Sequence, residues 1–238
     1  MSNPVTPYNT SESKKKQVAE MFNNVAGTYD FLNHFFSLGI DKLWRKKLVR
    51  MMGLQKPETI LDVATGTGDL AIAEAALHPK KIVGIDISEK MLDAGKSKIS
   101  KYPNIEFHLG DGENIPFPDD SFDAVSVSFG VRNFENVPKG LLEMRRVLNE
   151  NGKIYILEFS KPKNELFKKL YYFYFCTVLP FIGKLVSKDS NAYTYLPESV
   201  KQFPDGTAFV ALMEEAGYKE IKCTTLTFGI STIYTAKK

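Results

Sequence analysis

Four residues around one glycine-rich turn have the types and spacing of a nucleoside-binding site. Asp62 follows an apolar run, Gly66 and Gly68 come shortly after it, and a second apolar run ends at Asp86. Glycines let the backbone approach a ligand closely, and an acid at the end of the second strand accepts hydrogen bonds from ribose hydroxyls. The pattern therefore predicts a strand, a turn, a helix and a second strand that together hold an adenosine cofactor.

The glycines alone do not identify that cofactor. Residues 66–71 satisfy Gly-x-Gly-x-x-Ala, which also fits the turn of nicotinamide-dependent dehydrogenases. Two acids narrow the choice: the Asp62 carboxylate could order the turn or meet a ligand amine, and Asp111 follows a third apolar run. There Asp111 could bind the edge of an adenine ring that Gly112 admits. We therefore interpret the acids as the groups that select the ligand.

Alternating apolar runs and helical patterns position these residues. Such an alternation predicts a parallel sheet with helices on both faces. After it, a helix over 207–216 precedes two runs around Phe228-Gly229, which predict a closing antiparallel hairpin that is unlike the ordinary dinucleotide-binding arrangement. The parallel strands are expected at 60–63, 82–87, 105–109, 122–128 and 153–159, the helices from near Asp69, Ser88 and Glu135, and the hairpin strands at 221–227 and 230–236.

Two segments lie outside this alternation. Residues 14–52 carry apolar side chains at helical spacing and are divided by Gly27 and Gly39, whereas residues 1–13 are polar and expected to be flexible. Residues 170–182 are apolar and aromatic but too short to span a bilayer. That segment is either a core helix of an insertion or a lid that receives an apolar substrate, and composition leaves both open.

Composition favours one soluble domain without a nucleic-acid partner. The 238 residues are 43% hydrophobic and 25% charged, and the net charge of +3 is too small to indicate nucleic acid. Lys14-Lys15-Lys16 and Arg45-Lys46-Lys47 are expected on solvated helix faces, with contact to an anionic surface as the alternative. Cys176 and Cys223 lack metal-ligand spacing, so we expect buried reduced thiols and no metal site. The polar N-terminal residues show no signal peptide, which favours a cytoplasmic location.

The acids and glycines together resemble a class I S-adenosylmethionine-dependent methyltransferase. The resemblance rests on Asp-x-Ala-x-Gly-x-Gly at 62–68, the acids after the second and third strands, Asp120-Ser121-Phe122-Asp123 before the fourth, and the closing hairpin. Ala64 stands where glycine is common in the wider superfamily, and its small side chain is expected to cost no binding. The resemblance implies an α/β Rossmann-like seven-stranded sheet with a C-terminal antiparallel hairpin, N-terminal helices and a helical aromatic lid insertion.

Five further motifs resemble the menaquinone/ubiquinone biosynthesis C-methyltransferases. They lie in the same order along the chain, at 25–33, 37–44, 128–133, 157–162 and 191–199, and the resemblance runs from about residue 17 to residue 238. It implies one methyltransferase domain over 14–238, with a helical cap at 14–56 and a substrate-side insertion at 160–203.

The implied reaction is S-adenosylmethionine-dependent methylation of a ring carbon of a polyprenylated quinol. Demethylmenaquinol is the expected substrate, and a benzoquinol precursor of ubiquinone or another lipophilic small molecule is the alternative. A non-catalytic lipid-binding protein and a dehydrogenase are rival classes. Peripheral contact with the inner face of the cytoplasmic membrane is expected, while the prenyl length and a homodimer are left open.

The resemblance assigns cofactor contacts to Thr67, Asp86, Asp111, Gly112 and Ser128. The Thr67 backbone would meet the methionine part, Asp86 the ribose diol and Asp111 the adenine amino group. Ser128 closes the fourth strand at its carboxyl end, where ligands bind in open α/β sheets. The alternatives are a helix-start acid for Asp86 and a hydroxyl satisfied by backbone for Ser128. Asp62, Gly66 and Gly68 complete the expected cofactor-binding set.

Arg132, Asn133 and Tyr29 are the expected catalytic residues. Methylation of a ring carbon is helped when the neighbouring phenol loses its proton, so a base and a group that stabilises the phenolate are needed. Arg132 stays charged and suits the phenolate, Asn133 follows it in the sequence, and Tyr29 could relay a proton through water. His34 is a rival base, with a packed helix residue as the alternative reading.

The ring pocket is expected to carry aromatic side chains. Tyr193 and Tyr195, in the last of the five motifs, are the candidates.

Overall fold

A single seven-stranded sheet forms the centre of the computed structural model, which describes residues 5–8, 10–173, 177 and 191–238. The strand order is β3-β2-β1-β4-β5-β7-β6. Strands β1 to β5 run parallel, and β7 lies antiparallel between β5 and β6. This Rossmann-like methyltransferase sheet with its antiparallel end confirms the predicted fold. The strands are β1 Thr59–Val63, β2 Lys81–Asp86, β3 Ile105–Leu109, β4 Phe122–Ser128, β5 Leu148–Phe159, β6 Lys219–Leu226 and β7 Ser231–Lys237.

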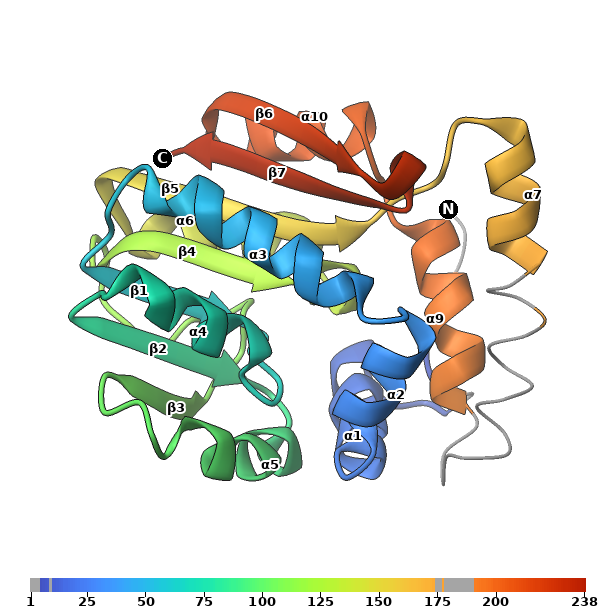
Figure 1. Cartoon of the computed structure of the whole chain (residues 1–238), viewed down its shortest axis with the longest axis horizontal. Helices are drawn as coiled ribbons and strands as arrows, with labels where there is room; N and C mark the ends of the chain where they lie inside the picture. The colour runs from blue at the N-terminus through green and yellow to red at the C-terminus, as the bar shows by residue number, and fades with distance from the viewer. Residues whose placement is uncertain (1–4, 9, 174–176, 178–190) are drawn as a thin grey trace.

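Helices cover both faces of the sheet, so the central strands are apolar on both sides (Figure 1). Ile60 packs with α3 and α4 on one face, and Leu61 packs with α6 and α10 on the other. Neither side chain has any exposed surface. The helices are α1 Lys14–Val25, α2 Tyr29–Phe36, α3 Ile40–Gly53, α4 Asp69–Glu74, α5 Glu89–Ile99, α6 Val137–Val147, α7 Glu165–Phe173, α9 Asn191–Gln202 and α10 Thr207–Glu215.

Most predicted boundaries agree with the structure, and two differ by a few residues. Strand β5 starts five positions early, at Leu148, because that residue pairs with Phe122 across an irregularity in the ladder. Helix α6 starts at Val137 because the Asn136 side chain accepts a hydrogen bond from the Lys139 amide and caps it. Gly39 has φ +73° and separates α2 from α3, as predicted.

The carboxyl ends of the parallel strands face the N-terminal helices. Figure 1 shows α1, α2 and α9 gathered at the edge of the sheet where the arrowheads of β4 and β5 end. Parallel strands bring their last residues to one edge, and that edge is where α/β sheets bind ligands. The fold therefore encloses the predicted site residues between the sheet and these helices.

The structure tests the prediction for one of the two cysteines. The prediction that Cys223 is buried is wrong: it is a free, exposed thiol because β6 is the edge strand of the sheet. Cys176 and most of the aromatic segment at 170–182 lie outside the described residues.

None of the described helices has the length and apolar character needed to cross a membrane. The proposed division into cap, insertion and flexible terminus stays a prediction.

Candidate functional site

The glycine turn is held in shape by the two acids at the ends of β1 and β2. The Asp62 carboxylate accepts hydrogen bonds from Thr65 Oγ1 at 2.6 Å and from the Ala71 amide at 3.2 Å. The Asp86 carboxylate accepts from the Gly66 amide at 2.9 Å and from the Ser88 amide at 2.8 Å. Asp62 therefore orders the turn, which is one of the two roles considered for it.

Both acids are buried, and burial favours their protonated forms. It raises the pKa of Asp62 to about 7 and that of Asp86 to about 6. Glu74, on α4, is fully buried, and the pKa of its carboxyl is raised well above the ordinary value by burial and by the Asp62 charge. Three buried carboxyl groups with raised pKa values thus lie around the turn and on α4 beside it.

A small cavity of about 60 Å³ opens beside the turn. A Cβ on Gly112 would lie 2.7 Å from Phe134 Cζ and 2.8 Å from Val63 Cγ1, so only glycine leaves this wall in place. Five of the predicted cofactor residues line the cavity together: Gly66, Asp86, Asp111, Gly112 and Ser128.

Three predicted cofactor residues do not line that cavity. Asp62 lies beneath the turn, and a Cβ on Gly68 would lie 2.4 Å from the Phe107 ring, so that glycine is needed for packing against β3. The Thr67 hydroxyl donates to Asp30 at 2.5 Å and accepts from Lys98 at 3.0 Å. The Asp62 and Thr67 side chains and the close packing at Gly68 therefore support the turn and do not form the cavity wall.

The N-terminal helices cover the small cavity. Lys15, Phe22 and Tyr29 line it from α1 and α2. The Lys15 ammonium lies 2.7 Å from the Asp111 carboxylate, which is the group expected to meet an adenine amino group. Sequence reasoning missed Lys15 because the pair joins residues 96 positions apart. A nucleoside in this cavity therefore needs a shift of Lys15 and of neighbouring side chains of α1.

A network of ion pairs joins the covering helices to the glycine turn. Lys98 lies 2.7 Å from Asp30 on α2 and 2.6 Å from Asp69 at the start of α4. Arg45, on α3, pairs with Asp41 at 2.5 Å. Asp41, Asp69 and His34 place their ligating atoms within 4.8 Å of one another, but Lys98 and Arg45 already pair with the two carboxylates. The cluster thus links helices to the turn through charge pairs.

His34 belongs to this network. Its Nδ1 lies 2.8 Å from Asp41. The side chain lines neither the small cavity beside the turn nor the larger cavity next to it. This position fits the interpretation of His34 as a packed helix residue, and it does not fit a catalytic base.

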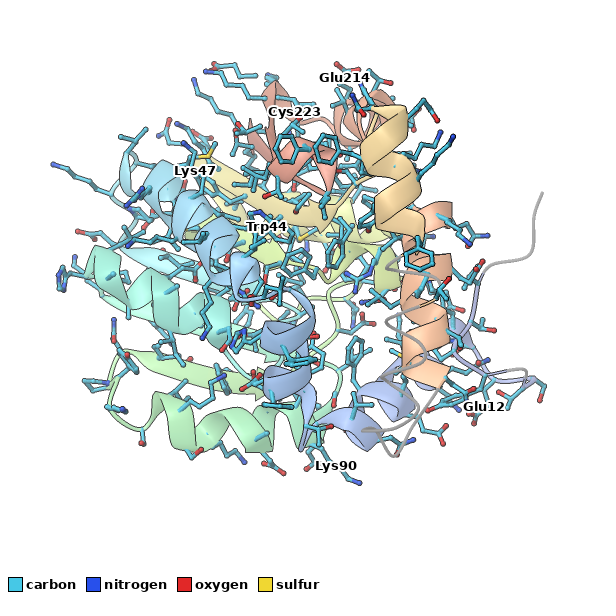
Figure 2. All side chains as sticks on the ribbon, turned by 45° about the vertical axis from the view of Figure 1, so that its right-hand side comes forward. Glu12, Trp44, Lys47, Lys90, Glu214 and Cys223 are labelled. Carbon is cyan, nitrogen blue, oxygen red and sulfur yellow. The ribbon has the colours of Figure 1, made fainter. Side chains whose placement is uncertain are left out.

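A larger apolar cavity of about 320 Å³ adjoins the small one. The two share Phe22, Tyr29, Phe129 and Asn133 in their walls. Trp44, labelled on α3 in Figure 2, lines the larger cavity, and its indole donates to Thr227 Oγ1 at 2.8 Å. The rest of the lining is mainly aliphatic and aromatic, and includes Met21, Val25, Ile40, Phe159, Tyr171, Tyr195 and Leu196.

The predicted catalytic residues and one predicted aromatic residue come together in this wall. Tyr29, Arg132 and Asn133 all line the apolar cavity, and so does Tyr195. Tyr193 has a side chain outside the described part of the structure. Burial raises the pKa of Tyr29, so its phenol is protonated at neutral pH and acts as a hydrogen-bond donor.

Arg132 is paired with a buried acid that the sequence analysis did not single out. Its guanidinium lies 2.8 Å from the Glu158 carboxylate and 5.3 Å from the centre of the Phe159 ring, and also donates to the Phe129 carbonyl. The Arg132 amide donates to the same carboxylate at 3.2 Å. Glu158 has no exposed surface, and its signal in the sequence was a single acid in the apolar run of β5.

Several buried polar atoms in this wall have no protein partner among the described residues. They are Asn133 Oδ1, Arg132 Nε and Tyr195 Oη. Buried polar groups are nearly always hydrogen-bonded, so unpaired groups around a cavity indicate a polar ligand or water. The arrangement can therefore hold an apolar ring with hydroxyl groups beside a nucleoside site.

Comparisons with known proteins agree with this geometry. A family model described as the ubiE/COQ5 methyltransferase family matches residues 10–238. The chain is 43% identical over 238 residues to demethylmenaquinone methyltransferase of Bacteroides fragilis, covering 98% of this chain and 97% of that protein. It is 44% identical over 239 residues to the ubiquinone/menaquinone biosynthesis C-methyltransferase UbiE of Geobacter sulfurreducens, covering 98% and 93%.

Solved structures with this fold are more distant in sequence. A SAM-dependent methyltransferase from Aquifex aeolicus has a TM-score of 0.55 at 20% identity, over 75% of this chain and 81% of its own. The [4+2]-cyclase SpnF has a TM-score of 0.67 at 16% identity, over 94% and 96%. These likenesses concern the fold, because one fold carries many activities.

Proposed function

The chain belongs to the ubiE/COQ5 methyltransferase family, and on that premise we propose that it transfers a methyl group from S-adenosylmethionine to a ring carbon of demethylmenaquinol. The observation that carries the proposal is the shared wall of the two cavities. A cavity of glycines and acids and an apolar cavity of about 320 Å³ meet at Tyr29 and Asn133. That volume lies at the lower end of the range of about 300–1,000 Å³ of small-molecule sites.

The residues of the small cavity fit S-adenosylmethionine. Asp86 would bind the ribose diol, Asp111 the adenine amino group, and Gly112 leaves room for the ring, while Gly66 and Ser128 complete the wall. Bound there, the cofactor supplies a methyl group that is activated by its positive sulfur. Thr67, Asp62 and Gly68 would act on this site by holding the turn in shape.

The polar groups of the apolar cavity suit the ring of a quinol. Asn133 Oδ1 can accept a hydrogen bond from a ring hydroxyl, and the protonated Tyr29 can donate one to a ring oxygen. Arg132 places its positive charge in the same wall, where it would stabilise a ring oxygen whose proton has passed to solvent. Because Glu158 neutralises part of that charge, the ion pair fixes the position of Arg132 and moderates its field. Methyl transfer then releases S-adenosylhomocysteine, and the ring regains its aromaticity when the displaced ring hydrogen leaves as a proton.

Orientation supplies much of the rate in such a reaction, since both partners are held and one is already activated. The mainly aliphatic and aromatic lining of the apolar cavity would exclude water from the ring. We assign Arg132, Asn133 and Tyr29 to the chemistry. The benzoquinol precursor of ubiquinone is the second candidate substrate, because relatives of similar identity carry both names.

We further propose that the enzyme works on the cytoplasmic face of a membrane. A polyprenylated quinol resides in lipid, and a protein that methylates its ring must reach it there. A homodimer stays an untested alternative for the state of the free protein.

Two measurements test the proposed function. Calorimetric titration should show binding of S-adenosylhomocysteine and none of NAD, which separates a methyltransferase from a dehydrogenase. Cells that lack the protein should accumulate demethylmenaquinone, and the purified protein should methylate a short-chain demethylmenaquinol. An unchanged quinone profile contradicts the proposal, and accumulation of an unmethylated benzoquinone selects the second candidate.

A further inference from the structure

Large apolar side chains surround the entrance of the apolar cavity and are exposed to solvent. Leu38 lines the cavity and is nevertheless 84% exposed, so it stands at the entrance. On the other side Thr227 lines the cavity, and the adjacent Phe228 is 69% exposed. We call these side chains the entrance surface, and it consists of Phe31, Phe35, Leu38, Leu43, Phe167 and Phe228.

Ring stacking within and between elements, and one hydrogen bond, position parts of this surface. Phe31 and Phe35 stack on α2 with ring centres 5.9 Å apart, and Phe167 of α7 stacks on Phe228 at 4.3 Å. The hydrogen bond from Trp44 to Thr227 keeps the first turns of α3 beside the turn at 227–229. Large exposed apolar side chains at the entrance of a cavity mark a place where something binds.

Two of these residues have a backbone conformation that their side chains disfavour. Leu38 has φ +50° and Phe228 has φ +55°, in the left-handed region that glycine and asparagine adopt more easily. Leu38 is 84% exposed, and Phe228 is 69% exposed although it stacks on Phe167, so burial within the chain contributes little at either position. A strained backbone that carries an exposed apolar side chain indicates that the side chain serves binding and not the stability of the fold.

Helix α3, which carries Leu43 of the entrance surface, is positively charged along its exposed side. Lys42, Lys46, Lys47 and Arg50 lie on the exposed side of α3, and none pairs with a carboxylate within the described residues. The only acid of this helix, Asp41, is buried and pairs with Arg45. Exposed aromatic side chains next to unpaired cations are typical of a protein surface that enters the headgroup layer of an anionic bilayer.

We propose that the entrance surface docks on an anionic lipid bilayer and aligns the cavity entrance with the lipid. This inference rests on the proposed function for its purpose, because a quinol ring can then enter the cavity while its prenyl tail stays in the lipid. A second copy of the chain is the other occupant that an apolar surface could take. The unpaired lysines of α3 favour the bilayer, because two copies would bring like charges together.

Vesicle binding tests the surface without reference to catalysis. The wild-type protein should sediment with vesicles of phosphatidylcholine and phosphatidylglycerol, less with phosphatidylcholine alone, and less at high salt. Phe228→Asn should weaken binding to the anionic vesicles by about tenfold, since it removes an inserted aromatic ring. Leu38→Asn should weaken it similarly, and both variants should unfold at the same or higher denaturant concentration than wild type.

The matched control is Leu54→Asn. Leu54 is another exposed leucine, at the opposite end of α3 from the entrance and with an ordinary φ of −67°, so its replacement should leave vesicle binding unchanged. Phe228→Asn should also lower methylation of long-chain quinol in vesicles while sparing a short-chain soluble quinol, because Phe228 does not line the cavity.

Two results would overturn the inference. One is unchanged vesicle binding in both Leu38→Asn and Phe228→Asn; the other is a change of oligomeric state in these variants without a change in vesicle binding, which would make the surface a contact between copies. Vesicle binding that depends on these residues in a protein that methylates no quinol would leave the surface standing and remove the proposed function.

Discussion

The small cavity and the apolar cavity share a wall, yet they are built from different kinds of parts. The small one is formed mainly by residues at the ends of neighbouring strands, and its Asp86 carboxylate already accepts hydrogen bonds from the Gly66 and Ser88 amides. The apolar one is closed by helices and turns from both ends of the chain, and its buried polar atoms lack partners among the described residues. The sheet thus fixes the strand-end wall of the first cavity, which α1 still covers, whereas the second cavity leaves polar atoms free to bind a ligand.

The largest expected effect comes from breaking the ion pair under the apolar cavity. Glu158→Ala leaves Arg132 buried without its counter-ion, which should lower the free energy of unfolding by about 3–5 kcal/mol. Denaturant unfolding measures this loss. Glu158→Gln keeps the shape and should fold more stably, with a reduced kcat and little change in S-adenosylhomocysteine affinity. Equal losses of kcat and cofactor affinity would show that the two halves are not separable.

A methyl group on Gly112 should weaken cofactor binding at the small cavity. Gly112→Ala places a Cβ within 2.8 Å of Phe134 and Val63, and overpacking of this size costs about 1–3 kcal/mol. Where this cost falls on the cofactor-bound state, affinity should drop by roughly 5- to 150-fold. Calorimetry should show the loss in S-adenosylhomocysteine binding. Gly27→Ala is the control, because a Cβ there meets nothing within 4 Å. Unchanged affinity in Gly112→Ala would contradict the assignment of the cavity.

The acids beneath the turn predict how stability depends on pH. The folded-state pKa of Asp62 is raised from 3.8 to about 7, so the folded chain binds more protons than the unfolded chain across that window. Stability should therefore fall as the pH rises from about 4 to 7. Glu74→Gln removes the neighbouring charge and should raise the free energy of unfolding at pH 8 by about 1–2 kcal/mol.

Unfolding curves measured across this pH range check the prediction. The exposed Glu214, labelled on α10 in Figure 2, provides the control substitution Glu214→Gln, which should leave the pH profile unchanged. A wild-type stability that rises between pH 4 and 7, or a Glu74→Gln profile parallel to wild type, would argue against raised pKa values at Asp62 and Glu74.

The smallest effect concerns the cover over the small cavity. Lys15 competes for the Asp111 carboxylate, so Lys15→Ala should tighten S-adenosylhomocysteine binding by about threefold, the size expected for loss of one partly exposed ion pair. Lys16→Ala is the matched control, because Lys16 is exposed on the same helix. A weaker affinity in Lys15→Ala would mean that Lys15 contributes to binding and does not compete.

The two cavities also differ in how far sequence could predict them. Asp86, Asp111, Gly112 and Ser128 were predictable because each stands at the end of an apolar run, and parallel strands bring such ends together. The alternation of runs and helices also predicted a parallel sheet closed by an antiparallel hairpin, and the structure confirms both.

The pairs that build the apolar half were not predictable in the same way. Arg132 meets Glu158 across 26 positions, and Trp44 meets Thr227 across 183. No local pattern specifies such pairs, because they arise only when the sheet and its covering helices are in place. The Cys223 prediction failed for a related reason: exposure at an edge strand depends on the order of strands and not on the residue type.

The order of the last two strands has a consequence for how the chain comes to be folded in a cell. Strand β6 precedes β7 in the sequence, but it reaches the sheet only through β7, which lies between it and β5. Until residues 231–237 leave the ribosome, β5 presents an open edge with unpaired backbone groups, and the chain before it is already rich in apolar strands. A nascent chain in this state is a natural client for a chaperone, and ribosome stalling before residue 231 would release a product prone to aggregation.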